Sequence, residues 1–328
     1  MTEVKTDIFS GRRVLFVAGR AQRPSDWPQV ATPQDEAACP FCPGHEAETP
    51  AELWALRAGA PDSPGWQIRV IPNKYPIVEP HELIIETPQH RFDLPDLPPQ
   101  QAEQVIFTYQ QRMRALAQHK TLRYLSLFKN QGRAAGASRA HAHAQLIGLP
   151  WLPPLIEAET EIAQRSYAEG GRCLYCQTIE RELGSGERVI ESDEHFLVWS
   201  PYAARLPYEC WILPLVHRHD FCQLSSTEIS SFARILQCTL ARLRGFLGAG
   251  RWAYNFYLHT APLPAEPGEL PQALEASYHW HLELLPRLTK LAGLEWSSGL
   301  YVNPVPPEEA ARALRAASSA PAAQVRLA

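Results

Sequence analysis

The pattern of hydrophobic and polar residues along this chain predicts short strands and two long helices. A Pro-rich start followed by apolar residues at helical spacing predicts a helix over Pro98–His119, and similar spacing predicts another near Thr227–Phe246. Segments rich in isoleucine, valine and leucine predict eight strands: Gln67–Ile71, His81–Glu86, Leu122–Lys129, Ala144–Gly148, Phe196–Ser200, Glu209–Leu213, Ala253–Leu258 and Trp280–Leu285.

The same succession of motifs occurs twice. C-P-F-C precedes E-L-I-I-E-T-P-Q-H and H-A-H-A-Q in the first half, and C-L-Y-C precedes E-C-W-I-L-P-L-V-H and H-W-H-L-E in the second. The separation from Glu82 to His90 is eight positions, and the separation from Glu209 to His217 is also eight. Three motifs in the same order indicate an internal duplication.

Two strands, a helix and two strands in each copy predict an α+β fold with a largely antiparallel sheet in each unit. We expect two fused units, an N-terminal catalytic unit over residues 1–165 and a C-terminal unit over 166–328. A Pro-rich stretch, Thr260–Glu275, predicts a long loop, and the Ala/Ser/Pro-rich tail from Ala317 is expected to fray.

Composition narrows the class of protein. With 328 residues, 45% of them hydrophobic and 20% charged, the chain has the make-up of a folded protein of two ordinary domains. Its net charge of -4 offers no basic field for nucleic acid, so no nucleic-acid partner is expected. No apolar run is long enough to span a bilayer, and the start lacks the order of a signal peptide. We therefore expect a cytoplasmic protein with no membrane association.

The H-A-H-A-Q motif places polar groups on one face of an apolar strand. Alternate residues of a strand point to the same side, so His141, His143 and Gln145 line up there. Upstream, residues 130–138 are mostly small, which lets backbone N–H groups approach an anion closely. A histidine beside such a segment is a candidate nucleophile for nucleotidyl transfer, and the alternative is a pair of structural histidines.

Each half also carries a candidate metal site. Four of the seven cysteines fall in C-x-x-C pairs, and an odd total fits a disulfide framework poorly. Two cysteines, a later histidine and the first histidine of H-x-H form a closed tetrahedral zinc set, so two zinc ions per chain are expected. The sets are Cys39, Cys42, His90 and His141 in the first half, and Cys173, Cys176, His217 and His279 in the second.

Lys129–Gln145, K-N-Q-G-R-A-A-G-A-S-R-A-H-A-H-A-Q, resembles the active-site signature of the galactose-1-phosphate uridylyltransferases, a branch of the histidine triad superfamily. The segments R-A-Q-R-P from Arg20 and R-V-I-P-N-K-Y-P around Asn73 resemble the same family. Near the C-terminus, the segment from Gly293 also resembles the related plant ADP-glucose phosphorylases.

The resemblance implies roles for individual residues. His143 attacks the α-phosphorus of a nucleotide sugar, His141 binds zinc, and Gln145 contacts the phosphoryl group where hydrolytic relatives carry a third histidine. A glutamine cannot supply a proton, so the nucleotidyl-enzyme can wait for an acceptor. The remaining implied substrate-binding residues are Arg20, Arg23, Asn73, Asn130, Gly136 and Ser138 at the nucleotide and phosphate, and Lys290 and Glu295 near the sugar. Homodimers with shared active sites are typical of the family.

Two departures from the family pattern matter, and the second of them leaves the base, uracil or adenine, open. Ala142 stands between the two histidines, where proline is usual. The second C-x-x-C, Cys173 and Cys176, is absent from many uridylyltransferases and present in the plant ADP-glucose phosphorylases.

In the second H-x-H, Glu283 replaces the glutamine, and a carboxylate there would repel a phosphate. The second unit is therefore interpreted as a structural partner.

These features predict a ping-pong nucleotidyltransferase. His143 takes UMP from UDP-glucose, and a hexose 1-phosphate such as galactose 1-phosphate then removes it. An ADP-glucose phosphorylase, which moves AMP from ADP-glucose to phosphate, is the nearest alternative. A catalytically silent nucleotide-binding regulator is an alternative of another class, and a dinucleotide hydrolase is disfavoured by Gln145.

Overall fold

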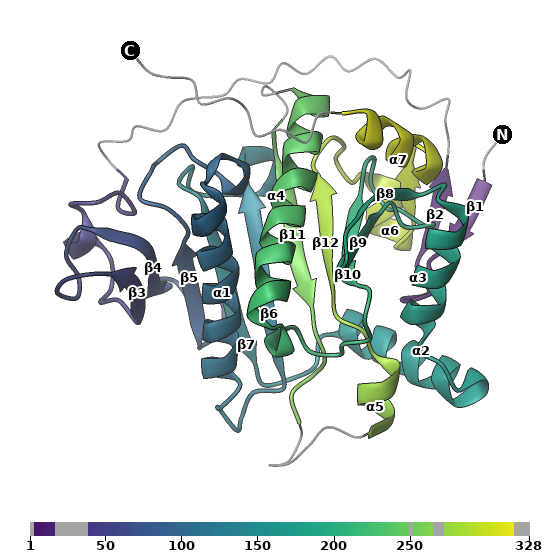
Figure 1. Cartoon of the computed structure of the whole chain (residues 1–328), viewed down its shortest axis with the longest axis horizontal. Helices are drawn as coiled ribbons and strands as arrows, with labels where there is room; N and C mark the ends of the chain where they lie inside the picture. The colour runs from purple at the N-terminus through teal and green to yellow at the C-terminus, as the bar shows by residue number, and fades with distance from the viewer. Residues whose placement is uncertain (1–2, 17–38, 249–251, 265–271, 318–328) are drawn as a thin grey trace.

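A ten-stranded antiparallel sheet runs through both halves of the chain (Figure 1). The computed structural model describes residues 3–16, 39–248, 252–264 and 272–317. From one edge to the other the strands are β3 (Trp54–Arg57), β4 (Trp66–Pro72), β5 (His81–Ile85), β7 (His143–Leu149), β6 (Tyr124–Gln131), β11 (Tyr254–His259), β12 (His281–Pro286), β10 (Cys210–Pro214), β9 (Phe196–Trp199) and β8 (Val189–Ser192). Every neighbouring pair is antiparallel.

The sheet is built from two copies of one unit. The order β4-β5-β7-β6 in the first half is mirrored by β9-β10-β12-β11 in the second, and β6 pairs with β11 at the centre. In this central pair Asn130 lies opposite Asn255, and Phe128 lies opposite Tyr257. The predicted α+β fold with a largely antiparallel sheet is therefore confirmed, and the two units share one sheet.

Two long helices cover one face of the sheet. In the foreground of Figure 1, α1 (Pro99–Leu116) and α4 (Ser226–Leu247) lie side by side and pack together. Helix α1 starts on a proline at its first position, where a missing N–H costs nothing. Helix α4 starts with a capping box in which Ser225 and Glu228 satisfy each other's backbone N–H groups. Both helices bury their apolar sides in the main core against the sheet.

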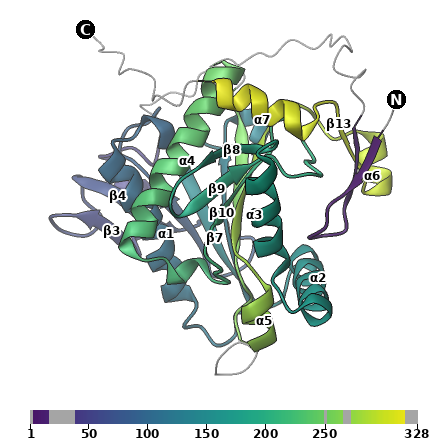
Figure 2. The ribbon, with the colours of Figure 1, turned by 45° about the vertical axis from the view of Figure 1, so that its right-hand side comes forward.

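The opposite face is covered mainly over the second unit. Its helices are α2 (Pro154–Gly170), α3 (Leu174–Ser185) and α5 (Gln272–Ser277), and Figure 2 brings forward the right-hand side of Figure 1, where α2 and α3 lie. Tyr175 of α3 packs on the rings of His279 and His281, so this helix covers the face on which His281 lies. Over the first unit, the same face carries the H-A-H-A-Q motif.

A small sheet joins the two ends of the described chain. It contains β1 (Glu3–Thr6), β2 (Arg13–Phe16) and β13 (Tyr301–Asn303), with β13 parallel to β2. Helix α6 (Gly293–Ser298) precedes β13, and α7 (Pro307–Ala316) packs on α4 and β8. The described part of the chain also has four short 3₁₀ helices: η3 (Glu46–Glu48), η4 (Leu94–Asp96), η5 (Arg133–Ala135) and η6 (Phe221–Gln223).

The eight predicted strands and both predicted long helices are present, with ends within three residues of the prediction. The predicted loop Thr260–Glu275 is partly wrong, because its last residues start α5; residues 265–271 lie outside the described part of the chain. None of the helices in the described part is both long and apolar enough to cross a bilayer.

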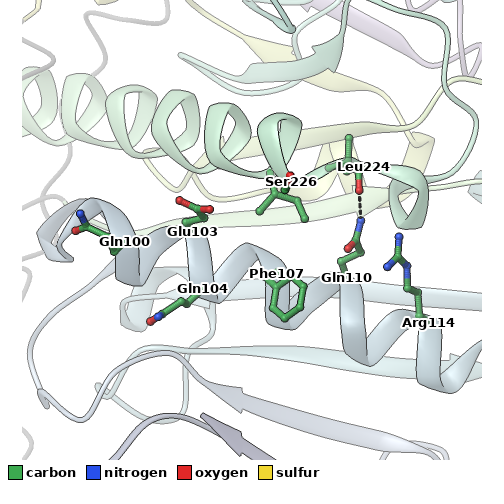
Figure 3. A pocket seen from close by; sticks show the side chains of 9 residues that line it. Gln100, Glu103, Gln104, Phe107, Gln110, Arg114, Leu224 and Ser226 are labelled. Atoms are coloured by element: carbon green, nitrogen blue, oxygen red, sulfur yellow. Dashed lines mark hydrogen bonds between the residues drawn. The ribbon is translucent and has the colours of Figure 1, made fainter. Parts of the chain in front are cut away.

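A pocket of about 430 Å³ lies between α1 and the start of α4, on the helical face (Figure 3). It is lined by Gln100, Glu103, Gln104, Phe107, Gln110, Arg114, Leu224, Ser226 and Ile229. The Gln110 amide donates to the carbonyl oxygens of Cys222 and Leu224 at 3.1 and 2.8 Å, and Arg114 Nε donates to Cys222 at 2.9 Å. These bonds join the two helical segments across the sheet from the H-A-H-A-Q motif.

Candidate active site and metal centres

Strand β7 presents His143 and Gln145 on the face of the sheet away from α1 and α4. Ala144, between them, is fully buried in the core under the helices. On the neighbouring strands, Ile85 lies opposite His143, and Leu83 and Phe128 lie opposite Gln145. The alternation predicted from the sequence therefore holds, and it brings both residues to one site.

His143 is held in one tautomer. Its Nδ1–H donates to the backbone carbonyl of His141 at 2.8 Å, which leaves the lone pair on Nε2. The Phe41 ring packs edge-on against the imidazole with centroids 5.4 Å apart, and the residue is 6% exposed. Burial lowers the pKa of His143, and the positive charges of Lys129 and Arg139 act in the same direction. A neutral imidazole with a lone pair on Nε2 can act as a nucleophile.

Lys129 lies behind His143, on the helical side of the sheet, and is fully buried. Its Nζ donates to Asp93 at 2.6 Å and also to Glu86. The Tyr109 hydroxyl also donates to Glu86 at 2.5 Å, so the Glu86 carboxylate accepts from two donors. Burial raises the pKa of Glu86, and the Lys129 charge opposes that shift. This buried cluster was not predicted.

Gln145 is joined to Asn73 through His81. His81 lies on β5, and its Nε2 donates to Gln145 Oε1 at 2.9 Å. The other ring nitrogen, Nδ1, accepts the backbone N–H of Ile77 at 3.3 Å, and it also lies 3.3 Å from Asn73 Nδ2, an amide nitrogen that can donate to it. Burial lowers the pKa of His81, so its neutral form is favoured. The structure therefore brings together Gln145 and Asn73, which were predicted, and His81, which was not.

Asn130 lies beside His143 on the neighbouring strand. Lys129 is opposite Ala144, and the antiparallel register continues to Asn130 and His143. Asn130 Oδ1 accepts a hydrogen bond from Asn255 Nδ2 at 2.7 Å, and the same Nδ2 donates to the carbonyl of Ala135 at 2.9 Å. Asn255 belongs to β11 in the second unit, so a residue of each unit contributes to this edge of the site.

The small-residue segment turns sharply after Asn130. Gly132 has φ +80°, and a Cβ there would lie 2.8 Å from the carbonyl oxygen of Trp252. Gly136 has φ +81° and ends η5 in the left-handed conformation. Both conformations favour glycine, so the two glycines are needed for the turn. Ser138, the other predicted residue of this segment, is exposed.

The first predicted metal set comes together beside the site. The ligand atoms of Cys39, Cys42, His90 and His141 all lie within 4.8 Å of one another. Cys42 Sγ lies 3.3 Å from His90 Nδ1 and 3.5 Å from His141 Nδ1. His141 Nε2 donates to the carbonyl of Thr87 at 2.7 Å, which leaves the Nδ1 lone pair directed at the sulfur atoms. Burial lowers the pKa of His141 to about 4.

The second set has the same arrangement. The ligand atoms of Cys173, Cys176, His217 and His279 again lie within 4.8 Å of one another. Cys176 Sγ lies 3.4 Å from His217 Nδ1 and 3.7 Å from His279 Nδ1. His217 Nε2 donates to Glu275 O and His279 Nε2 donates to Pro214 O, so both rings expose Nδ1 lone pairs to the sulfur.

Both sets fit a tetrahedral ion. Bonds of about 2.3 Å to sulfur and about 2.1 Å to nitrogen imply a separation of about 3.6 Å between a sulfur and a nitrogen ligand. The observed separations between 3.3 and 3.7 Å match this spacing. A backbone carbonyl that accepts from a ligating imidazole is the usual outer partner of such a metal site.

The second H-x-H lies under other side chains. His281 is fully buried, stacked at 4.7 Å against Trp211. Glu283 accepts hydrogen bonds from Arg205 and Tyr257. A third group of possible metal ligands lies here, because Glu159, His259, His281 and Glu283 have ligand atoms within 4.8 Å of one another. This group was not predicted as a set, since Glu159 and His259 belong to no motif.

Two predicted substrate-binding residues of the described chain, Lys290 and Glu295, do not join the group around His143. Arg20 and Arg23 lie outside the described residues. Lys290 is exposed, and Glu295 accepts from the backbone N–H of Ala292 at the start of α6. Within the described part of the chain, neither Lys290 nor Glu295 forms a hydrogen bond or ion pair with a residue of that group.

Two models of one known protein family match most of the chain. Residues 80–153 match Galactose-1-phosphate uridyl transferase, N-terminal domain, and residues 159–315 match Galactose-1-phosphate uridyl transferase, C-terminal domain. An ADP-glucose phosphorylase from Arabidopsis thaliana is 32% identical over 96% of this chain and 93% of its own length. A galactose-1-phosphate uridylyltransferase from Thermotoga maritima is also 32% identical, over 71% of this chain and 73% of its own length.

A solved structure agrees. The crystal structure of an ADP-glucose phosphorylase from Arabidopsis thaliana with bound ADP-glucose superposes with a TM-score of 0.84 and 30% identity. The match covers 97% of this chain and all of that one. The likeness therefore extends over both units.

Proposed function

This chain belongs to the galactose-1-phosphate uridylyltransferase family and is a nucleotidyltransferase, and from that premise we propose that His143 carries a nucleoside monophosphate between two phosphate groups. The observation that supports His143 most directly is its tautomer. The bond from Nδ1 to the His141 carbonyl leaves the Nε2 lone pair on the face that carries Gln145 and Asn130.

The proposed reaction is a double displacement. Nε2 of His143 forms a bond to the α-phosphorus of a nucleotide sugar, while the bond from that phosphorus to the bridging oxygen breaks and the sugar 1-phosphate leaves. An oxygen of the acceptor phosphate then attacks the same phosphorus, and the N–P bond breaks. The proton on Nδ1 stays in place through both steps, because the His141 carbonyl stabilises the positive ring of the intermediate.

Gln145 supports transfer over hydrolysis. Its amide can donate a hydrogen bond to a phosphoryl oxygen, but it cannot deliver a proton to a leaving group or take one from water. The intermediate would then react slowly with water and rapidly with a bound phosphate nucleophile.

Two substrate pairs remain candidates for this chemistry. The sequence favours UMP transfer between UDP-glucose and hexose 1-phosphate. AMP transfer from ADP-glucose to phosphate is supported by the Arabidopsis thaliana relative, which matches along nearly its whole length, and by the second Cys-x-x-C. The second pair has the broader support, because the uridylyltransferase relative matches a shorter part of the chain.

The test is to incubate the protein separately with UDP-glucose and with ADP-glucose and to weigh the intact chain. A gain of one UMP or one AMP unit identifies the base. The adducted protein is then given galactose 1-phosphate or inorganic phosphate, and the acceptor that restores the original mass is identified. No mass gain with either nucleotide sugar would contradict the covalent mechanism.

We further propose that both Cys₂His₂ sets hold zinc, giving two ions per chain. Bound zinc would fix the strand that carries His143, since His141 is at once a ligand and the acceptor of the His143 hydrogen bond. Elemental analysis of freshly purified protein is expected to give about two zinc ions. Cys173→Ser is expected to lower that content by one.

We also propose that the chain consists of two units, 1–165 and 166–328. We propose a homodimeric state and a cytoplasmic location as well. Large exposed apolar side chains support the dimer: Tyr75 is 80% exposed, Ile77 78% and Trp296 77%. Tyr75 and Ile77 follow Asn73, and Trp296 follows Glu295, so a dimer contact at either place would lie next to a predicted substrate residue. Light scattering in solution measures the assembly.

A further inference from the structure

We propose that His81 and Asn255 are positioning residues that fix the side-chain amides of Gln145 and Asn130, so that both amides donate N–H groups to the transferred phosphoryl group. The inference deepens the proposed function and rests on it. An amide can turn either its oxygen or its nitrogen toward a ligand. An oxygen facing a phosphate would repel it, so the orientation matters for the reaction.

A backbone group determines the orientation of Gln145. The N–H of Ile77 can only donate, so His81 Nδ1, 3.3 Å away, must accept. The proton of the neutral ring therefore lies on Nε2, and Nε2 must donate to Gln145 at 2.9 Å. The accepting atom of Gln145 is then its oxygen. None of the hydrogen bonds among the described residues uses the Gln145 NH₂ group, and this is the group that we assign to the phosphoryl oxygen.

A second backbone group determines the orientation of Asn130. The carbonyl of Ala135 can only accept, so the Asn255 atom 2.9 Å away must be its NH₂ nitrogen. The same nitrogen contacts Asn130 at 2.7 Å, so the Asn130 atom there must be an acceptor, which is its oxygen. The NH₂ group of Asn130 is consequently turned away from Asn255.

Both amides lie on the face that carries His143. Gln145 follows His143 by two positions on β7, and Asn130 lies beside His143 on β6. A phosphorus atom bonded to Nε2 would thus have one amide donor along the strand and another across the strands. Donors fixed before the reaction stabilise the charge that develops on the phosphoryl oxygens, and removal of one such donor typically costs about 100- to 1,000-fold in rate.

Three substitutions of His81 change the group that faces the Gln145 oxygen. His81→Gln keeps an N–H donor for the Gln145 oxygen, His81→Leu removes it, and His81→Glu replaces it with an acceptor. The readout is the single-turnover rate of adduct formation at saturating nucleotide sugar. We expect His81→Gln to stay within about fivefold of the wild type, His81→Leu to lose about tenfold, and His81→Glu to lose about 100-fold.

Asn255 offers an independent pair of variants. Asn255→Asp has nearly the same shape but cannot donate to Ala135 or Asn130, so it favours a reversed Asn130. Asn255→Ser keeps one donor. We expect Asn255→Asp to slow adduct formation by about 100-fold and Asn255→Ser by about tenfold or less. Zinc content and thermal midpoint, measured for each variant, separate lost positioning from lost folding.

Equal rates for the wild type, His81→Leu and Asn255→Asp would overturn the inference, as would equal losses in the Gln and Glu variants of His81. Failure of the proposed function gives a different result, because the wild type itself would then form no adduct. In that case the affinities for AMP and UMP, measured by calorimetry, test the positioning directly. The order expected is His81→Gln above His81→Leu above His81→Glu, and equal affinities would again overturn it.

Discussion

The two H-x-H motifs occupy matching places in one sheet, yet their surroundings differ completely. His143 retains 6% exposure and is followed by the neutral Gln145. His281 is fully buried and is followed by Glu283, which binds the Arg205 guanidinium. The buried carboxylate of Glu283 requires a cation beside it, which Arg205 supplies. Helix α3 covers the face of the sheet on which His281 lies. The duplication has kept the strand order, while the residues around each second histidine differ: the first unit leaves its proposed nucleophile partly exposed, and the second encloses its histidine in the core.

Removal of each second histidine gives the sharpest contrast. His143→Ala deletes the proposed nucleophile, so transfer is expected to fall on the order of a millionfold, or to background. His281→Ala leaves His143 and Gln145 untouched and should still form the adduct. Intact-protein mass after incubation with nucleotide sugar measures both variants. An adduct on His143→Ala would contradict the proposal that His143 is the nucleophile.

Adduct lifetime tests the glutamine that distinguishes the first motif. Without a general acid or base at Gln145, hydrolysis should be about 100- to 10,000-fold slower than discharge to a phosphate acceptor. Gln145→His is expected to narrow that gap by speeding hydrolysis. Decay of a radiolabelled adduct, with and without acceptor, measures both rates. Equal rates in the wild-type protein would favour a hydrolase.

Glu283→Gln tests the carboxylate of the second motif. The change leaves the buried Arg205 with one carboxylate partner, Glu209, in place of two. Breaking a buried ion pair from one side typically costs about 3–5 kcal/mol of folding free energy. We expect denaturant unfolding to show a loss approaching that size while the adduct still forms, with metal content as a control. A variant as stable as the wild type would show that the pair contributes little.

The smallest expected effect concerns His81, whose counterpart in the second unit is Tyr208. Burial lowers the pKa of His81 in the folded chain, and Asn73, Ile77 and Gln145, which bond its ring, carry no charge. The unfolded chain therefore takes up a proton first as the pH falls, and stability declines between the ordinary histidine pKa and the lowered one. His81→Gln should lose less stability than the wild type between about pH 7.5 and 5.5. Urea unfolding at both values measures the difference, and identical pH dependence would contradict the assignment.

Local sequence patterns predicted the repeated unit well. Strands such as β7 and β12 and helices α1 and α4 have clear periodicity. The two candidate metal sets follow from motif spacing, and the eight residues lie together in two groups that could each hold an ion. Elements that only tertiary contacts stabilise were missed. Strand β13 has three residues and forms by pairing with β2, nearly 300 positions earlier.

The site was predicted only where a motif marked it. His141, His143 and Gln145 stand together in one pattern, whereas His81 and Asn255 are single polar residues on strands. Their proposed roles depend on strand pairing, which places His81 on the strand beside Gln145 and Asn255 opposite Asn130. A histidine at the start of a strand next to H-x-H was a weak signal. Asn255 offered none before the β6–β11 pairing was known.

The β6–β11 pairing also bears on how the protein is made. The hydrogen bond from Asn255 to Asn130 joins residues 125 positions apart. On a ribosome, the chain carrying His143 emerges first and can fold its own strands, but Asn130 waits for its partner. A nascent chain stopped before β11 would therefore have its nucleophile and lack one oriented donor. Under the proposed mechanism, competence for chemistry would begin only after β11 has been made and has paired with β6.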